Sequence, residues 1–246
     1  MLVLALATVL ALPPTPAPVQ AWAEEACPSP ARAPESNIAL KHEERQRAEC
    51  LRKAMSEALD TVILPLRERN PSAYEEWMAL QAAYDRWVEE ACAAVEEARW
   101  VDVAAGERLM GTGYGLTESR CLQHQYAWRG FFAGAWARED WKLLQYALSE
   151  YAEPAWRARQ ALPEYLARTE AAAARAPAEV EVPPLPVRPL SRTDWEAYNA
   201  RLHRVTALPE VLARRQCALA PHPAPDCTSR FADSLFAFLG LSEEVP

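Results

Sequence analysis

The side chains that could carry out chemistry in this chain are few, and their spacing does not bring them together. Acidic residues are paired as Glu89-Glu90 and Glu96-Glu97 in a helical stretch. Two carboxylates act as general acid and base only when both reach one substrate atom, and adjacent residues on an α-helix point about 100° apart. We therefore interpret both pairs as a solvated helix face. The sequence holds no Ser–His–Asp, phosphate-loop or dinucleotide-binding signature, so we expect no catalytic residue and a protein that is not an enzyme.

Residues with metal-ligand spacing are equally sparse. The segment Cys121-x-x-His124 has half of the spacing of a zinc site, but no second Cys or His pair completes it. The other histidines, His42, His203 and His222, are scattered along the chain. We expect structural roles for Cys121 and His124, no metal site and no cofactor.

A glycine-rich stretch, Gly111-Thr-Gly113-Tyr-Gly115, precedes a predicted helix. Backbone N–H groups at such a helix start could bind an anion. We favour the simpler interpretation, a loop that lets the chain reverse between two helices.

The amino-terminal segment has the pattern of an export signal. The first 23 residues contain no charged side chain, and the run from Leu2 to Leu12 is apolar. Ala21-Trp22-Ala23 then matches an A-x-A cleavage site. The run is shorter than the roughly 20 apolar residues that cross a bilayer, and no lipid-attachment motif precedes Cys27. We predict a signal peptide over residues 1–23 that is cleaved near Ala23, no transmembrane segment, and a secreted or periplasmic protein.

The charge balance narrows the class of partner. The chain has 34 acidic and 26 Lys or Arg residues, which gives a formal net charge of −8. This charge argues against binding to nucleic acid or to anionic membranes. It suits solubility, the plain interpretation, and it would also suit a basic protein partner.

The residue pattern predicts an all-α fold. Glycine is scarce, and no alternating β-branched run is longer than a few residues. Apolar residues recur at three- and four-residue spacing, which is typical of amphipathic helices. The predicted helices cover about 38–69, 73–101 with Ser72 as its cap, 117–150 with Thr117 as its cap, a stretch to about 175, a helix opened by Ser191-x-x-Asp194, a short one from Leu208, and 228–239.

Proline content divides the chain into regions. Residues 177–190 hold five prolines and are expected to form an extended linker. We predict a helical domain over 24–136, connecting helices over 137–176, and a C-terminal helical region over 191–246. The first domain would be an antiparallel helical hairpin plus a third helix.

Six cysteines in an exported chain favour three disulfides. If the first two long helices form a hairpin that turns at Pro71, residues equally far from that turn lie level. Cys50 and Cys92 are both 21 residues from Pro71. We therefore predict the pairs Cys50–Cys92, Cys27–Cys121 and Cys217–Cys227; the alternative pairs Cys27 with Cys50 and Cys92 with Cys121.

Aromatic residues offer the best candidates for a binding surface. Most of the nine Trp residues fall on apolar helix faces and are expected in the core. Trp128 and Trp136, beside Phe131 and Phe132, are the candidates for an exposed aromatic patch.

The stretch from about Cys27 to Gly134 resembles the LprI-like lysozyme-inhibitor N-terminal family. The second helix of that family is similar to Q-x-x-W-x-x-Y-R-D-x-x-C, and a glycine turn and C-x7-R follow it. The residues of this chain at the matching spacings are Gln81, Tyr84, Trp87, Cys92, Cys121 and Arg129. Val88-Glu89 stands here where the family has Arg-Asp.

The resemblance implies a disulfide-stapled helical domain of the bacterial envelope that inhibits lysozyme by non-covalent docking. The partner would then be a basic hydrolase such as lysozyme. The alternative is a structural module of the cell envelope whose Trp-rich C-terminal half binds peptidoglycan or another protein. No single residue of the sequence indicates which surface is used.

Overall fold

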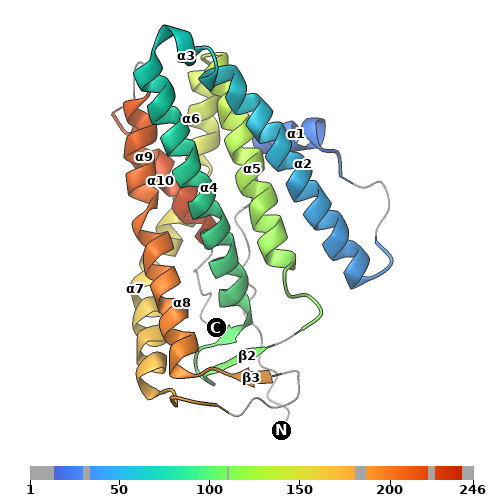
Figure 1. The fold of residues 1–246 in the computed structure, drawn as a ribbon, viewed down its shortest axis with the longest axis vertical. Coiled ribbons are helices and arrows are strands. Elements are labelled where there is room, and N and C mark those ends of the chain that lie inside the picture. The colour runs from blue at the N-terminus through green and yellow to red at the C-terminus, as the bar shows by residue number, and fades with distance from the viewer. Residues whose placement is uncertain (1–13, 30–33, 110, 181–186, 221–224, 240–246) are drawn as a thin grey trace.

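The computed structural model describes residues 14–29, 34–109, 111–180, 187–220 and 225–239, and most of these residues lie in α-helices (Figure 1). The fold is all-α, as predicted, and disulfides staple the bundle. The helices are α1 (Ala17–Ala26), α2 (Asn37–Ile63), α3 (Leu66–Arg69), α4 (Pro71–Trp100), α5 (Leu116–Ala137), α6 (Trp141–Ser149), α7 (Ala152–Arg175), α8 (Arg192–Ala207), α9 (Pro209–Ala218) and α10 (Cys227–Phe236), with a 3₁₀ turn over Ala237–Leu239.

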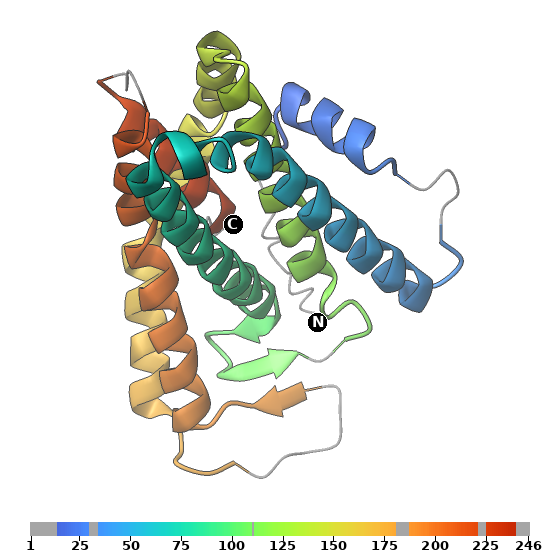
Figure 2. The same ribbon diagram turned by 45° about the horizontal axis from the view of Figure 1, so that its top comes forward.

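Helix α5 is the centre of the bundle. It contacts α1, α2, α4 and α6, and it lies between α2 and α4 in the turned view (Figure 2). On the other side of α4, α8 and α9 pack against it, and α7 and α10 complete that layer. One hydrophobic interior runs through both parts of the molecule. Described residues of the predicted regions 24–136 and 191–246 therefore share a core.

Helix boundaries follow local backbone chemistry, with some corrections to the prediction. Asn70, not Ser72, caps α4, because its side chain accepts a hydrogen bond from the Ala73 N–H group. Helix α5 does not reach residue 150, because Glu139 has a positive φ of 54° and ends the run. Asp140 then caps α6. The predicted capping box of Ser191 and Asp194 is confirmed at the start of α8.

A small sheet at one end of the bundle was not predicted. Strand β1 (Val101–Asp102) pairs antiparallel with β2 (Glu107–Leu109), and β2 pairs antiparallel with β3 (Val187–Pro189). Arg108 is the register partner of both Val101 and Arg188. Part of the predicted proline-rich linker is thus a sheet edge. Residues 181–186 of that linker lie outside the described ranges.

The disulfide pairing corrects the sequence-based prediction. Cys27 is bonded to Cys50 and Cys92 to Cys121, while the predicted Cys217–Cys227 bond is confirmed. The prediction failed because α2 and α4 do not lie side by side along their length. Helix α2 packs instead on α5, which separates the two arms of the supposed hairpin (Figure 2). The alternative pairing is therefore the observed one.

The predicted cleavage site lies within helix α1. Ala23 is a buried residue of that helix, and Cys27 is the first residue after the end of the helix. The apolar run Leu2–Leu12 lies outside the described residues. Within the described part of the chain, no helix is both long and apolar enough to cross a membrane.

Candidate functional site

Three residues of the resemblance motif meet in the interior around Arg129. Arg129 is on α5, and Gln81 and Tyr84 are on successive turns of α4. Arg129 Nε donates a hydrogen bond of 3.0 Å to Gln81 Oε1, and its guanidinium carbon lies 4.8 Å from the centroid of the Tyr84 ring. A cation over an aromatic face is attracted by the quadrupole of the ring. Only 3% of Arg129 is exposed, so this is an interior contact.

Residues outside the motif complete the surroundings of Arg129. Arg129 Nη1 donates a 2.6 Å hydrogen bond to Gln216 Oε1 from α9. Its guanidinium carbon also lies 5.7 Å from the Trp77 ring centroid and 5.3 Å from that of Phe132. Sequence reasoning missed Gln216, because no spacing pattern links residues 87 positions apart. We refer to Gln81, Tyr84, Arg129 and Gln216, with the rings of Trp77 and Phe132, as the Arg129 cluster.

The Arg129 cluster holds a positive charge with amides and aromatic rings. Within the described ranges, no carboxylate lies at ion-pairing distance from Arg129. Burial lowers the pKa of Arg129 to about 10, so the side chain stays protonated at neutral pH. Asp85 is the acid whose field reaches Arg129. Burial raises the pKa of Asp85, and a 2.7 Å hydrogen bond from Gln81 Nε2 opposes that rise.

The remaining motif residues tie α4 to distant parts of the chain. Tyr84 donates a 2.8 Å hydrogen bond to Gln125 Oε1 on α5, and burial raises the pKa of its hydroxyl well above the ordinary range. Trp87 Nε1 donates a 2.9 Å hydrogen bond to the Val205 carbonyl of α8. The motif is therefore a buried structural hub that connects α4, α5, α8 and α9.

The predicted exposed aromatic patch is wrong. Trp128, Phe131 and Phe132 are 1%, 3% and 0% exposed, and Trp136 is half-buried. Their rings pack against other helices: the centroids of Trp128 and Tyr151 are 5.3 Å apart. The physical reason is the central position of α5, whose middle packs among α1, α2, α4 and α6. Such a helix is apolar around its whole circumference.

The half-buried Trp136 borders a small apolar pocket. Its ring centroid lies 5.1 Å from that of Trp141 and 5.4 Å from that of Trp77. The pocket has a volume of about 70 Å³ and also contacts Cys227 of the Cys217–Cys227 disulfide. It is too small for a drug-sized ligand, whose sites are of about 300 Å³ or more.

Glu96 is buried, which contradicts the predicted solvated face. It is 1% exposed, whereas Glu89 is exposed as expected. The Glu96 carboxylate accepts hydrogen bonds from the N–H groups of Gly115 (2.6 Å) and Glu118 (2.8 Å) at the start of α5. Trp100 Nε1 donates a third bond of 2.6 Å. The glycine loop thus binds an anion, and that anion is a side chain of the protein itself.

The capping of α5 by Glu96 has a local cause. Gly115 is the cap residue and offers no side chain, and its φ of 89° is one that glycine adopts readily. The predicted cap, Thr117, is instead a buried residue within the helix. The first N–H groups of a helix need acceptors and favour negative charge. Glu96 on α4 satisfies both needs.

Glu97 is also buried and links three segments. It accepts a 2.7 Å bond from Arg201 Nη1 on α8 and forms an ion pair with Arg108 on β2. Its carboxylate therefore joins the end of α4 to the sheet and to the C-terminal region. Neither Glu96 nor Glu97 showed this role in the sequence, because most of their partners, Gly115, Glu118, Arg108 and Arg201, lie on other parts of the chain.

Replacement of Glu96 tests this capping role. We expect Glu96→Ala to lower the free energy of unfolding by about 2–3 kcal/mol, because three N–H donors lose their acceptor in a buried place. Glu96→Gln keeps one acceptor oxygen and should lose less, about 1 kcal/mol. Urea unfolding measures both values. Exposed Glu89→Ala is the control, with a change within about 0.5 kcal/mol; equal effects of Glu96→Ala and Glu89→Ala would contradict the capping role.

A pocket lies between α1, α2 and α5. Its volume is about 390 Å³, and its lining includes Arg47, Arg120 and Gln123. The two arginines are already paired: Arg120 with Glu44 at 2.9 Å, and Arg47 with Glu24 at 2.5 Å. Both arginine charges that line the pocket are therefore neutralised by acidic partners.

His124 forms the inner wall of this pocket. Its Nε2 lies 3.0 Å from the Tyr151 hydroxyl, and its ring meets that of Phe238 edge-on at 4.2 Å. Burial lowers the pKa of His124 to about 3, because the interior disfavours the charged imidazolium. Cys121, its partner in the C-x-x-H pattern, is in a disulfide. Among the described residues, no group of three His, Cys, Asp or Glu side chains is placed to hold a metal ion.

The low pKa of His124 predicts acid sensitivity. Above pH 6.5 His124 is neutral in both states; between pH 6.5 and about 3 only the unfolded chain binds the proton. The free energy of unfolding should therefore fall by about 1.4 kcal/mol for each pH unit in this window. His124→Gln keeps a hydrogen-bonding group for Tyr151 and does not titrate. Unfolding of this variant should take up one proton fewer between pH 6.5 and about 3, so its free energy of unfolding should fall less steeply as the pH is lowered. Equal slopes for the two proteins would contradict the prediction.

Comparisons with known proteins identify no relative of this chain. No family model matches the chain, and neither a curated protein nor a solved structure matches it.

Proposed function

We propose that this chain is an exported binding protein that docks non-covalently on a basic hydrolase such as lysozyme and blocks its cleft. One observation carries the proposal: the polar motif residues Gln81, Tyr84 and Arg129 are bonded to one another or to neighbours inside the bundle. These side chains are therefore not free to contact a partner, and we assign partner binding to the outer surface of the bundle. In this proposal the chain has no catalytic residue of its own.

Charge and rigidity support a docking role. The net charge of −8 complements a basic partner and would speed encounter with it. Three disulfides hold the helices in place, so little conformational entropy is lost on binding. The resemblance of Cys27–Gly134 to the LprI-like family provides the partner class.

Export is part of the proposal. The disulfides, and the lack of a membrane-spanning helix in the described ranges, are compatible with an extracellular protein. We propose that a leader directs the chain out of the cytoplasm, to the periplasm or the medium, and that cleavage follows.

A lysozyme turbidity assay tests the docking role. We expect the protein at micromolar concentration to slow the clearing of a cell-wall suspension by at least one animal-type lysozyme. Slowing should weaken as ionic strength rises, because the Debye length falls from about 10 Å at 0.1 M to about 3 Å at 1 M. No slowing of any of several lysozyme types would reject the proposal.

Two controls separate specific docking from general charge effects. An unrelated protein with a similar net charge should not slow the enzyme. The same chain after reduction and alkylation should lose its effect, because the bundle then lacks its three disulfides. Slowing by all three samples would assign the effect to acidity alone.

A second function has one observation in its favour. Trp156 on α7 is 62% exposed, whereas Trp128 and Trp195 are buried. An exposed indole can stack on a sugar ring, so the C-terminal half could anchor the protein to peptidoglycan as an envelope scaffold. Retention on insoluble peptidoglycan at high salt, lost in Trp156→Ala and kept in Trp156→Phe, would favour this function over inhibition.

A further inference from the structure

Helix α1 is built into the bundle. Val19 is 0% exposed, and the half-buried Trp22 packs on the core. The helix contacts α5, α2 and α6. If cleavage followed the A-x-A pattern at Ala21–Ala23, Val19 and Trp22 would be removed with the leader.

The Trp22 ring leaves no room for a side chain at Gly130 on α5. A methyl group placed at residue 130 would overlap the Trp22 ring, and the three heavy atoms nearest to it are all in that ring. Glycine within a helix is less stable than alanine. A close approach of the indole explains why glycine occupies the middle of α5. The absence of a side chain at Gly130 therefore matches a folded protein in which Trp22 is present.

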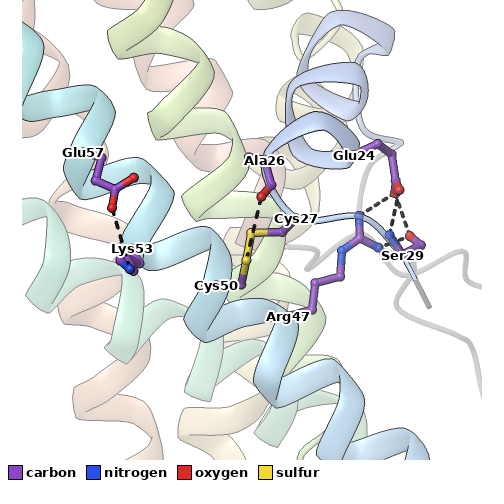
Figure 3. The surroundings of a disulfide bond; sticks show 8 residues. All are labelled: Glu24, Ala26, Cys27, Ser29, Arg47, Cys50, Lys53 and Glu57. Atoms are coloured by element: carbon purple, nitrogen blue, oxygen red, sulfur yellow. Dashed lines mark hydrogen bonds and ion pairs between the residues drawn. A yellow bond between two sulfur atoms is a disulfide. The ribbon is translucent and has the colours of Figure 1, made fainter.

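Polar contacts hold the carboxyl end of α1. Glu24 accepts hydrogen bonds from the Ser29 N–H (2.8 Å) and hydroxyl (2.7 Å), and Arg47 of α2 donates to it at 2.5 Å (Figure 3). The Cys27–Cys50 disulfide joins the same end covalently to α2 (Figure 3). Glu24 would be the first residue of a chain cut after Ala23. Such a cut removes Val19 and Trp22 and leaves the groove above Gly130 open.

We infer that helix α1 belongs to the mature protein, and that processing hydrolyses a peptide bond on the amino-terminal side of Ala17 instead of the bond after Ala23. The reaction adds one water molecule across a single peptide bond, which releases the upstream leader. The apolar run Leu2–Leu12 remains available as that leader. The inference concerns processing and does not depend on what the protein binds.

The mature amino terminus tests the inference directly. The protein is purified from its source cells through a carboxy-terminal tag, and its intact mass and first residues are determined. We expect a shortened chain that begins at or before Ala17, and an uncleaved chain overturns the inference. A first residue at Trp22, at Glu24 or anywhere else after Ala17 overturns the inference, whatever the outcome of the lysozyme assay.

A matched pair of variants provides a second readout. Trp22→Ala should lower the melting temperature of the purified protein by about 5 °C or more, because the cavity beside Gly130 is left unfilled. The exposed Gln20→Ala on the same helix should leave the melting temperature unchanged. If α1 is removed on export, both variants have the mass and the melting temperature of the wild-type protein, which overturns the inference.

Discussion

Replacing Arg129 by alanine is expected to lower the free energy of unfolding by about 3–5 kcal/mol. The substitution removes a buried side chain that three aromatic rings surround. It also leaves the amide oxygens of Gln81 and Gln216 without their donor in the interior. An unpaired buried polar group costs about 1–3 kcal/mol.

Chemical unfolding in urea measures this loss through the midpoint and slope of the transition. Arg86 is exposed on α4, so Arg86→Ala is the matched control, with a change within about 0.5 kcal/mol. Arg129→Lys should recover only part of the loss, because an ammonium group lacks the planar fork that reaches both glutamines. A loss below about 1 kcal/mol in Arg129→Ala would contradict the structural role of the cluster.

Removal of the Cys92–Cys121 disulfide should have the other large effect. Both cysteines are 0% exposed, and they join α4 to α5 across a sequence separation of 29 residues. Closing a loop of this length in the unfolded chain corresponds to about 3.5 kcal/mol. We expect the double replacement of Cys92 and Cys121 by alanine to lose at least that amount.

The double replacement of Cys217 and Cys227 is the control for this experiment. Their loop spans 10 residues, which corresponds to about 2.5 kcal/mol. Peptide mapping without reductant should recover Cys92 linked to Cys121. A peptide that links Cys50 to Cys92 would contradict both the pairing and the expected order of the two losses.

The helices could be predicted from the sequence because their causes are local. Apolar spacing marks the long helices, and the Ser191–Asp194 capping box and Pro209 mark two starts correctly. The strands could not be predicted in this way. Each is two or three residues long, and β3 pairs with β2 across a long separation: Leu109 and Val187, which are register partners, are 78 residues apart. Such pairs have no periodic signal.

The prediction of the cysteine pairing depended on which helices pack side by side, and the local sequence does not determine this. The hairpin model placed Cys50 level with Cys92, but the neighbour of α2 is α5. Cys50 therefore faces Cys27 beside α1, and Cys92 faces Cys121 on α5. The choice of neighbour is set by the whole bundle and not by the distance of each cysteine from Pro71.

The central position of α5 did have a sequence signal. Residues 126–128 and 130–133 are aromatic, alanine or glycine, so apolar groups cover every side of that helix. A helix of this kind is buried, and this pattern argues against an exposed patch at Trp128 and Phe132. Glu96 had no comparable signal, because the backbone N–H groups of Gly115 and Glu118 that it accepts from come near it only in the folded bundle.

The long sequence separations within the core have a consequence for the order of events during synthesis. The Trp87–Val205 bond spans 118 residues, and the Arg129–Gln216 bond spans 87. The part of the interior that joins α4 and α5 to α8 and α9 therefore forms only after the ribosome has made those two helices. Folding through such non-local contacts is slow. A growing chain whose core is still incomplete when its last helices are made can be passed through a narrow membrane pore more easily than a finished bundle.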